Sequence, residues 1–528
     1  MRFMSWKLFK KELALKELDD ETKFILGLDI GTRATKIAIW NVNRKQAELI
    51  DMSGGYGTPS IPTVMQYIPE NKEWVFGEYA LLNKGDFDDI TINNIMSKLG
   101  TKELIEIGGK AMNIPSILAR YIKEIIEMCK NLNPNGEVVG LVATVPDYFP
   151  ESAREEFKRA FAMAGLDKVL ITFMTFRECI LRYLYFGQTI DKEEKVLFID
   201  YGGQQIRGGV IQVNPESKGR VKAESLSFLF DASLGGKKLD KLLKELFIDF
   251  YCQETGLLRT QLDEDTIHQI EVFAYQNKYL LFQNYYKKKP TKLYFNFAYP
   301  AFQKTLEVEQ LDKLIEPFAK SIQDFISNLL EKTIHGAVQK EEIQKVIAVG
   351  GGFEMNWVKE LIEHEFMGID IEYPRDSEGT LALGACIGAA SYLGVVPELM
   401  IEIEDYHKLT FDIGLEGIYE KQSRFIPLVE RNSFWWQKAR PRIFILDLGG
   451  SNFLEIPIYA KNEQGEIKTL EVIKLDNLPR NPSRTLRLKF DLKFSQYDTI
   501  ELSIKDCGFG EIIPPSDFSK TFNIQLSW

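Results

Sequence analysis

Two segments of the chain place an aspartate and a glycine at the end of an apolar run, and this pairing suits phosphate chemistry. Asp29 and Gly31 close the run FILGLDIG, and Asp200 and Gly202 close KVLFIDYG. Glycine lets backbone N–H groups approach phosphate oxygens, while a neighbouring carboxylate holds Mg²⁺ directly or through water. A single turn of this kind is common in proteins, so its recurrence is the informative feature.

Two further glycine turns stand at the boundaries of expected strands and helices. Gly235 and Gly236 open a helix in LGGKKLD, and Gly350–Gly352 follow the apolar strand KVIAV. Four such turns in this order favour a nucleotide-phosphate site over four unrelated turns. A fifth, Asp447-Leu448-Gly449-Gly450, lies in a β-rich tail, where we interpret it as a hairpin turn.

The elements that must position these turns indicate a duplicated fold. Each Asp-x-Gly ends one apolar strand and is followed by a second β-rich run, and Asp29 and Asp200 are 171 residues apart. A repeat at that distance predicts two similar lobes rather than a solenoid. Between the copies, fourfold apolar spacing predicts a helix after Pro115, and Val138–Pro146 reads as a buried strand. This alternation predicts an α/β fold.

The pattern changes near Pro397. Beyond it, β-branched and aromatic residues alternate with polar ones in short runs separated by turns, which predicts an all-β sandwich. The predicted organisation is a leader at 1–22, an α/β nucleotide-binding domain at 23–396, a linker at 397–409 and a sandwich domain at 410–528.

Composition narrows the function classes. The 528-residue chain has a net charge of −11, which argues against a nucleic-acid surface. It has no apolar stretch of the roughly 20 residues that a membrane span needs. Five scattered cysteines fit buried thiols in a reducing compartment better than disulfides or a zinc site. These features predict a cytoplasmic protein.

The leader 1–22 mixes aromatic with basic residues but has no apolar signal-peptide core. Its apolar residues are scattered around a helical wheel. A solvated or core-docking helix is therefore favoured, and contact with an anionic membrane is the minor alternative.

The order of these motifs resembles the seventy-kilodalton heat-shock chaperone (Hsp70) family. In the first domain LGLDIGTRATKIAIW, TVPDYF, FIDYGG, LGGKKLD, VGGG and LGAC follow the family's order, and in the tail LTFDIGLEG, IPLVERN and LDNLPRNPSRTLRLKFDL are similar. The resemblance implies a bilobed actin-like ATPase domain, a duplicated ribonuclease-H-like fold, followed by a β-sandwich that binds peptide. The family's helical lid has no counterpart after the sandwich.

The resemblance also implies ligands and their contacts. The cofactor is ATP or ADP, with Mg²⁺ as an optional metal on Asp29 and Asp200, and Thr32 matches the threonine that touches the γ-phosphate. The remaining nucleotide-binding candidates are Gly31, Arg33, Gly202, Gly203, Arg207, Gly235, Gly236, Lys278, Gly350, Gly351 and Gly352.

Several positions depart from the family's catalytic set. Met96 stands for the catalytic lysine, with Lys98 two residues away, and Thr175 stands for the glutamate that positions water, with Glu178 nearby. Arg207 replaces a second carboxylate at the metal site. These losses predict ATP hydrolysis that is weak or absent, so whether the chain is an enzyme stays open.

Arg207 itself has two interpretations. Its guanidinium either grips a phosphate and replaces part of the metal's charge, or pairs with Asp29 and Asp200 and closes an empty site. The family's adenine-flanking Lys-Arg pair corresponds to Lys278-Tyr279, and a tyrosine still offers a stacking surface for a base.

In the tail, two loops of the family line the peptide groove with apolar side chains. The corresponding candidates are Ile418, Phe444, Leu446 and Phe453, and for each of them a place in the sandwich core is an equally good interpretation.

Three functions remain in order of preference. The first is a chaperone-like protein that binds nucleotide in the bilobed domain and an unfolded peptide or protein client in the sandwich, with co-chaperones unspecified. The second is a pseudo-ATPase scaffold that binds no nucleotide. The third is an actin-like filament or cell-shape protein attached peripherally to a membrane, against which the sandwich argues.

Overall fold

The computed structural model describes residues 22–52, 58–82, 90–130, 134–147, 149–188, 190–214, 220–231, 233–396, 400–404, 409–419, 422–433, 439–448, 451–479, 485–496 and 499–526. The leader, apart from Thr22, lies outside them, so its role stays a prediction. The chain divides into two compact units, one formed by Met1–Pro146 with Phe157–Tyr406 and the other by Asp147–Glu156 with His407–Trp528. The domain boundaries predicted above stay a prediction.

The first sheet of the first unit begins with the predicted apolar run. Its strands are β1 (Lys23–Ile30), β2 (Ala34–Asn41), β3 (Gln46–Leu49), β4 (Ser60–Pro62), β10 (Glu137–Val145) and β11 (Leu170–Thr175). They lie in the order β11-β10-β1-β2-β3, with β4 beside β2. The strand β1 is parallel to β10 and antiparallel to β2, and β10 is parallel to β11. After its first residue β1 is buried throughout, as expected of a central strand covered on both faces.

The second sheet repeats this plan. Its strands are β12 (Glu194–Tyr201), β13 (Ile206–Asn214), β14 (Arg220–Ser225), β15 (Leu229–Asp231), β18 (Lys345–Val349), β19 (Asp370–Glu372) and β20 (Met400–Glu404). They lie in the order β19-β18-β12-β13-β14-β20, with β15 beside β13. Strand β12 is parallel to β18 and antiparallel to β13, and β18 is parallel to β19, so the first five strands repeat the directions of the first sheet. The predicted bilobed, duplicated α/β fold is confirmed.

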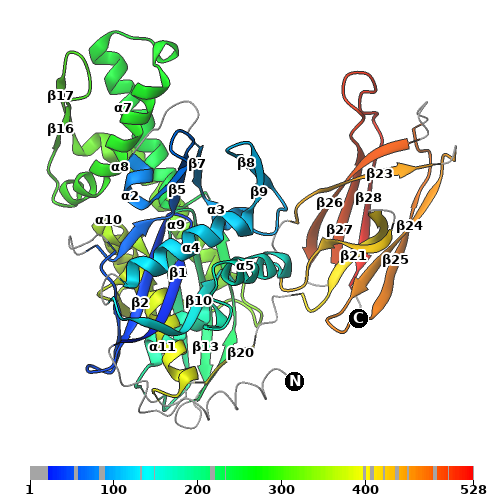
Figure 1. The fold of residues 1–528 in the computed structure, drawn as a ribbon, viewed down its shortest axis with the longest axis horizontal. Coiled ribbons are helices and arrows are strands. Elements are labelled where there is room, and N and C mark those ends of the chain that lie inside the picture. The colour runs from blue at the N-terminus through cyan, green and yellow to red at the C-terminus, as the bar shows by residue number, and fades with distance from the viewer. Residues whose placement is uncertain are drawn as a thin grey trace. The chain divides into compact units, whose positions relative to one another are not determined.

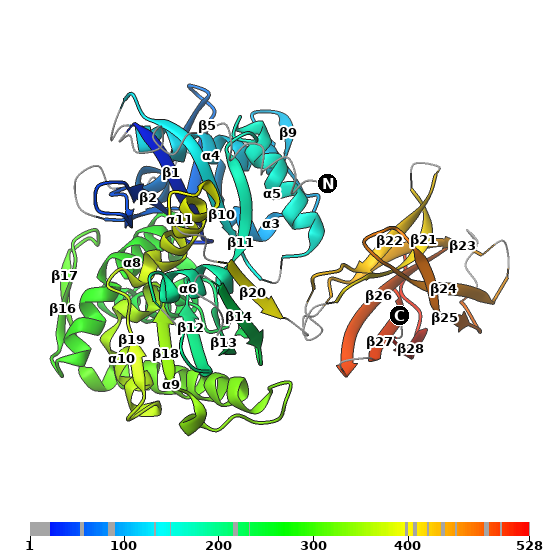
Figure 2. The same ribbon diagram turned by 90° about the horizontal axis from the view of Figure 1, so that it is seen from below.

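The helices repeat as well. In the first lobe α4 (Ile114–Lys130) precedes β10, α5 (Glu151–Met163) joins β10 to β11, and α6 (Phe176–Tyr185) follows. Helices α9 (Val308–Glu331), α10 (Asn356–Glu365) and α11 (Thr380–Leu393) take the same places around β18 and β19. Figure 2 shows α6 and α11 between the two sheets.

Close packing of α11 depends on small residues. A Cβ on Gly27 of β1 would lie 2.1 Å from the carbonyl oxygen of Ala382, and one on Gly384 would lie 2.0 Å from that of Cys179 on α6. Every residue from Thr380 to Ser391 is buried. The small-residue helix predicted from GTLALGACIGAASYLG is therefore the element that joins the lobes.

Smaller elements extend from the two sheets (Figure 1). In the first lobe they are α2 (Gly77–Leu82), α3 (Ile95–Lys98), the sheet of β5 (Val64–Ile68), β6 (Glu73–Phe76) and β7 (Ile90–Asn93), and the hairpin of β8 (Leu104–Ile107) and β9 (Lys110–Asn113). In the second they are α7 (Gly236–Thr255), α8 (Glu264–Tyr286), β16 (Thr291–Phe295) and β17 (Phe302–Leu306).

The tail is the predicted all-β sandwich. One sheet has the order β22-β21-β24-β25 and the other β23-β26-β27-β28, and their inner faces share one apolar core. The strands are β21 (Asp412–Tyr419), β22 (Gln422–Val429), β23 (Arg442–Asp447), β24 (Leu454–Lys461), β25 (Ile467–Leu475), β26 (Thr485–Gln496), β27 (Thr499–Asp506) and β28 (Ser519–Gln525).

Two local expectations differ from the structure. A hairpin was expected at Asp447–Gly450, of which Gly449 and Gly450 lie outside the described residues, but the flanking strands β23 and β24 belong to different sheets of the sandwich. Part of the predicted linker, residues 400–404, is the strand β20, which extends the second sheet beside β14. Among the described residues, no helix is long and apolar enough to cross a membrane.

Candidate functional site

The turn between β1 and β2 is held by a buried hydroxyl network. The Thr35 hydroxyl lies 3.0 Å from that of Thr63 and accepts a hydrogen bond of 2.8 Å from Tyr121 of α4. The backbone N–H of Thr63 donates to the carbonyl of Arg33 at 2.8 Å. Thr32 is half-buried within this turn. These hydrogen bonds hold the backbone of the turn in place, as a phosphate-binding turn requires.

Asp29 ends β1 as a buried carboxylate. The hydroxyl of Thr144 on β10 donates to its Oδ1 at 2.6 Å, and the residue is 5% exposed. Burial raises the pKa of Asp29, and the nearby charge of Asp200 adds to this rise. Lys36, the Thr144 hydrogen bond and Arg207 oppose the rise without cancelling it.

Asp200 is already paired within the protein. It faces Arg207 directly across β12 and β13, and the Nε and Nη2 atoms of Arg207 lie 2.6 and 2.5 Å from its Oδ2. The guanidinium lies over the Phe176 ring, 3.6 Å from the centroid. A Cβ on Gly350, whose φ is +96°, would lie 2.5 Å from Asp200 Oδ1. The turn at Gly350–Gly352 therefore closes over the other carboxylate oxygen.

Arg33 reaches from the first lobe to the second. Its Nη1 donates to Asp240 Oδ2 of α7 at 2.9 Å, and its guanidinium lies 4.6 Å from the centroid of the Tyr275 ring on α8. A Cβ on Gly203 would lie 2.8 Å from the Arg33 Cβ, so the first and second turns touch. Lys278, which is 2% exposed, pairs with Asp240 Oδ1 at 2.8 Å.

The electrostatics of Lys278 follow from its surroundings. Burial and then the positive charge of Arg33 lower the pKa of its ammonium, and Asp240 opposes both, so that the pKa is about 8. The pKa of Lys237 is likewise lowered by burial and then by Arg33. Cations are therefore crowded on this side of the cleft.

The glycine turns of the second lobe are tied together by backbone hydrogen bonds. The N–H of Gly236 donates to the carbonyl of Gly202 at 3.1 Å, and that of Lys237 donates to Gly203 at 2.7 Å. Gly235 is the N-cap of α7. The structure thus brings the two Asp-x-Gly turns, Gly235–Gly236 and Gly350–Gly352 together at one place.

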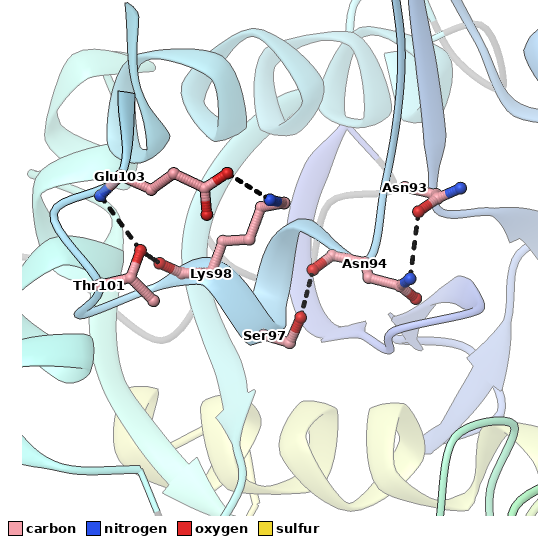
Figure 3. A network of polar contacts seen from close by, with 6 residues as sticks. All are labelled: Asn93, Asn94, Ser97, Lys98, Thr101 and Glu103. Atoms are coloured by element: carbon pink, nitrogen blue, oxygen red, sulfur yellow. Dashed lines mark hydrogen bonds and ion pairs between the residues drawn. The ribbon is translucent and has the colours of Figure 1, made fainter. Parts of the chain in front are cut away.

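The positions expected to replace the catalytic lysine take no polar part in this cleft. Met96 is buried on α3, and the ammonium of Lys98 pairs with Glu103 at 2.5 Å (Figure 3). Asn94, at the start of α3, instead accepts a hydrogen bond from Lys237. The ammonium of Lys98 is therefore already paired with a carboxylate.

Thr175 and Glu178 form the capping box of α6. The Glu178 carboxylate accepts from the backbone N–H of Thr175 at 2.6 Å and from its hydroxyl at 2.9 Å. This pairing satisfies the first turn of the helix. Glu178 is thus held at a helix end, with its carboxylate already bonded.

Some residues of the site were not singled out from the sequence. Asp240 is the partner shared by Arg33 and Lys278, and Tyr275 stacks on Arg33. The signal for Asp240 was present, since it follows Gly236 by one helical turn in LGGKKLD. Thr144 gave no signal, because a threonine in an apolar strand is common.

The peptide candidates of the sandwich divide into two pairs. Phe444 and Leu446 pack against the sandwich core, and the Phe444 ring lies edge-on to Phe490 at 5.0 Å. Ile418 and Phe453 are 82% and 42% exposed. On β23 the exposed apolar side chains are instead Ile443 and Ile445, at 48% and 65%.

Comparison with known proteins agrees with this architecture. A family model described as "Hsp70 protein" matches residues 86–434, and one described as a domain of unknown function (DUF8552) matches residues 408–526. Similar curated proteins include the "Chaperone protein DnaK" of three organisms. That of Cenarchaeum symbiosum is 26% identical over 495 residues, which cover 92% of this chain and 71% of the relative.

The other two are equally distant. The protein of Nitrosopumilus maritimus is 25% identical over 497 residues, or 92% of this chain and 73% of the relative. That of Thermotoga maritima is 24% identical over 504 residues, or 93% and 80%. With the family model covering most of a duplicated α/β domain whose glycine turns lie together, the chain belongs to the Hsp70 family.

Proposed function

We propose that the protein is a client-binding member of the Hsp70 family in which ATP or ADP acts as a conformational or structural ligand, with hydrolysis weak or lost. One observation carries this proposal. The four glycine turns that would surround a nucleotide are kept around one cleft, while the positions for chemistry hold a buried methionine, a helix cap and an ion-paired arginine.

Nucleotide binding is supported by what the cleft offers to an anion. The turn at Gly202–Gly203 lies against the start of α7, and the cations Arg33 and Lys237 flank both. Fixed cations are donors that phosphate prefers. The family implies the nucleotide, and the DnaK relatives extend over this whole domain.

The loss of hydrolysis rests on the geometry at the replaced positions. Met96 has no charge to offer a phosphate, and Thr175 and Glu178 bond to each other in a capping box. Phosphoryl transfer depends on positioned water and on neutralising developing charge, and removing one such group commonly costs about 10²-fold or more. Two lost groups predict turnover near background.

A second candidate, a scaffold without nucleotide, is favoured by the ion pairs of the cleft. Arg207 neutralises Asp200, and Arg33 joins the lobes through Asp240, so the protein satisfies its own charges without a ligand. The two candidates differ in one property. A nucleotide-binding protein must use the N–H groups that these ion pairs leave unused, whereas a scaffold has no ligand for them.

Client binding is assigned to the sandwich. Strand β23 is an edge of its sheet within the described residues, and it exposes Ile443 and Ile445. An edge strand with apolar side chains suits an extended peptide, which adds backbone hydrogen bonds and fills side-chain sites. Ile418 and Phe453 add exposed apolar surface on the same unit. An unfolded protein segment in the cytoplasm is the client that we propose.

The test combines turnover with peptide binding. Single-turnover hydrolysis of ATP is measured beside the DnaK of Thermotoga maritima, and the affinity for a library of labelled unfolded peptides is measured by anisotropy with ATP, with ADP and without nucleotide. We expect hydrolysis near background and a peptide affinity that changes with nucleotide. Peptide binding that ignores saturating nucleotide would leave the scaffold as the better interpretation.

Neighbouring side chains of β23 provide a matched pair for the client site. Ile445→Ser removes an exposed apolar group and should weaken peptide binding about tenfold while leaving the unfolding free energy within about 0.5 kcal/mol. Phe444→Ala removes a ring packed on the core and should cost about 2–3 kcal/mol of stability. If Ile445→Ser leaves every peptide affinity unchanged, β23 does not hold the client.

A further inference from the structure

The magnesium ion implied by the family does not fit the cleft. Both nitrogens of the Arg207 fork lie on Asp200 Oδ2, and Gly350 closes over Oδ1. Mg²⁺ at a nucleotide is held in near-octahedral geometry by one or two carboxylates, together with waters and phosphate oxygens. The oxygens of Asp200 are already taken up by Arg207 and Gly350. A metal here would have to sit beside a fixed guanidinium and displace it from its carboxylate.

The neighbouring residues hold the guanidinium of Arg207 in a fixed position. Its side chain is 13% exposed, it is in register with Asp200 on the neighbouring strand, and the Phe176 ring lies beneath it. Breaking a buried pair of this kind leaves an uncompensated charge and costs several kcal/mol. The positive charge of Arg207 is therefore a fixed feature of the folded protein.

A second guanidinium stands at the first turn. Arg33 lies against Gly203, and its Nη1 is 3.5 Å from where a Cβ on Gly236 would be. It is therefore surrounded by the turns expected to bind phosphate. Arg33 and Arg207 together bring two positive charges to these turns, the same charge as one Mg²⁺ ion.

A buried hydroxyl nearby also lacks its partner. Tyr201, directly after Asp200, is fully buried, and its hydroxyl has no hydrogen-bond partner within the part of the chain that the structure describes. Asp240 is close enough to raise the pKa of this hydroxyl, as burial does. A buried donor without an acceptor is costly, so this group needs a further acceptor such as a ligand oxygen or water.

We propose that the cleft binds a nucleoside di- or triphosphate as the magnesium-free anion, with Arg207 and Arg33 providing the positive charge that the metal provides elsewhere in the family. The inference rests on the proposed nucleotide binding and makes it specific. It predicts that phosphate oxygens bind the N–H groups of the two guanidinium groups that the pairs with Asp200 and Asp240 leave unused. It also predicts that the carboxylate of Asp29, without a metal to bind, is a repulsive neighbour of the ligand.

The first test needs no variant. Calorimetric titrations of ATP and ADP into the full chain are run with excess Mg²⁺ and with EDTA. We expect the affinity in EDTA to equal or exceed that in Mg²⁺, and inorganic triphosphate to compete in EDTA. Binding that requires Mg²⁺ overturns this inference alone. Absence of binding under both conditions overturns it together with the nucleotide part of the proposed function.

Variants then separate the two sources of charge. Arg207→Asp restores the family's carboxylate, so binding in EDTA should fall at least about tenfold while Mg²⁺ restores it. Arg33→Ala should weaken binding about tenfold under both conditions. Arg44→Ala removes an exposed arginine that pairs only with nearby Glu48 and should change neither titration. An Arg207→Asp protein that binds equally well in EDTA overturns the inference.

Asp29→Asn keeps the fold and tests the role of the carboxylate. The amide oxygen still accepts the hydrogen bond from Thr144, so the residue stays in place. If the ligand is free of metal, removing this negative charge should tighten ATP binding in EDTA by a few-fold. A tenfold loss of affinity in this variant with excess Mg²⁺, but not in EDTA, would show that the carboxylate binds a metal, and the inference would be wrong.

Discussion

A buried carboxylate that is not fully compensated costs folding free energy, and Asp29 is such a group. Burial raises its pKa, so the folded chain binds the proton of Asp29 more tightly than the unfolded chain does. The stability from this group is complete below the unfolded pKa and is lost as pH rises through the folded pKa. At neutral pH its charge is therefore a net cost, as is common for residues kept for binding.

The Asp29→Asn variant also measures this cost in folding free energy. Asp29→Asn cannot ionise, so it should raise the free energy of unfolding at pH 7, and the gain should shrink as pH falls towards 4. Urea unfolding monitored by circular dichroism at four pH values measures this difference. A loss of stability at pH 7 would mean that Lys36 and Arg207 stabilise the carboxylate more than burial destabilises it.

For Lys278 we predict the opposite dependence of stability on pH. Its pKa is lowered to about 8, so between pH 8 and its ordinary value the unfolded chain binds more protons and stability rises with pH. Lys278→Met removes this titration and leaves Asp240 paired with Arg33. The stability of wild type minus that of the variant should grow by about 2 kcal/mol from pH 8 to pH 10, because each pKa unit corresponds to about 1.4 kcal/mol. If this difference in stability does not change between pH 8 and pH 10, the ammonium of Lys278 is exposed to solvent and not buried.

At the residue scale the sequence allowed the positions of the turns to be predicted but not their pairing. Asp29, Asp200 and the glycines were found because a strand end with Asp-x-Gly is visible in one dimension. The Arg33–Asp240 contact joins residues 207 positions apart, so no local pattern indicates it. For Arg207 both interpretations were open, and the structure shows the pair with Asp200.

At the element scale β20 shows how an edge strand can read as a linker. Its residues alternate apolar and acidic, with Ile401 and Ile403 half-buried and Glu402 and Glu404 outward. Acidic residues near Pro397 suggested a linker, but Lys222 and Arg220 of β14 lie beside Glu404 and Glu402 at 3.2 and 3.7 Å. The acids therefore mark the solvent face of a strand whose partner lies far away in sequence.

This arrangement predicts which face of β20 holds it in place. Ile403→Asp puts a charge on the half-buried face and should detach the strand, so that the amides of residues 400–404 lose hydrogen-exchange protection. Glu402→Gln weakens an exposed ion pair with Arg220 worth about 0.2–1 kcal/mol and should leave the protection unchanged. Equal protection in the Ile403→Asp protein would mean that backbone pairing with β14 alone holds β20.

The strand β23 shows a different limit of sequence analysis. Four apolar residues in a row, Ile443–Leu446, carry no alternation, so the face of each residue could not be assigned. A shift of one residue moves every side chain to the other face of a strand. Phe444 and Leu446 were chosen as peptide contacts, yet they pack on the core, and their neighbours are exposed.

At the scale of the whole molecule the duplication was the most predictable feature. Strand directions and helix order follow from one repeated pattern of about 170 residues, and the repeat is visible because both copies keep the same strand–turn–strand motif. The sandwich was predictable from alternation and turn spacing. The strand pairing inside it was not, since the Asp447–Gly450 turn joins two sheets where a hairpin was expected.

Because the two units have separate hydrophobic cores, we expect each unit to unfold in its own thermal transition. Leu488 is fully buried in the sandwich core and Leu197 in a core of the first unit, and replacing either with alanine should cost about 2–5 kcal/mol. In scanning calorimetry Leu488→Ala should lower only the sandwich transition and Leu197→Ala only the other. ATP at about 100 times its Kd should raise only the first unit's transition, by about 2.7 kcal/mol of stability. If either substitution lowers both transitions together, the two units unfold as one cooperative body, and a nucleotide bound in the first would stabilise the client-binding sandwich directly.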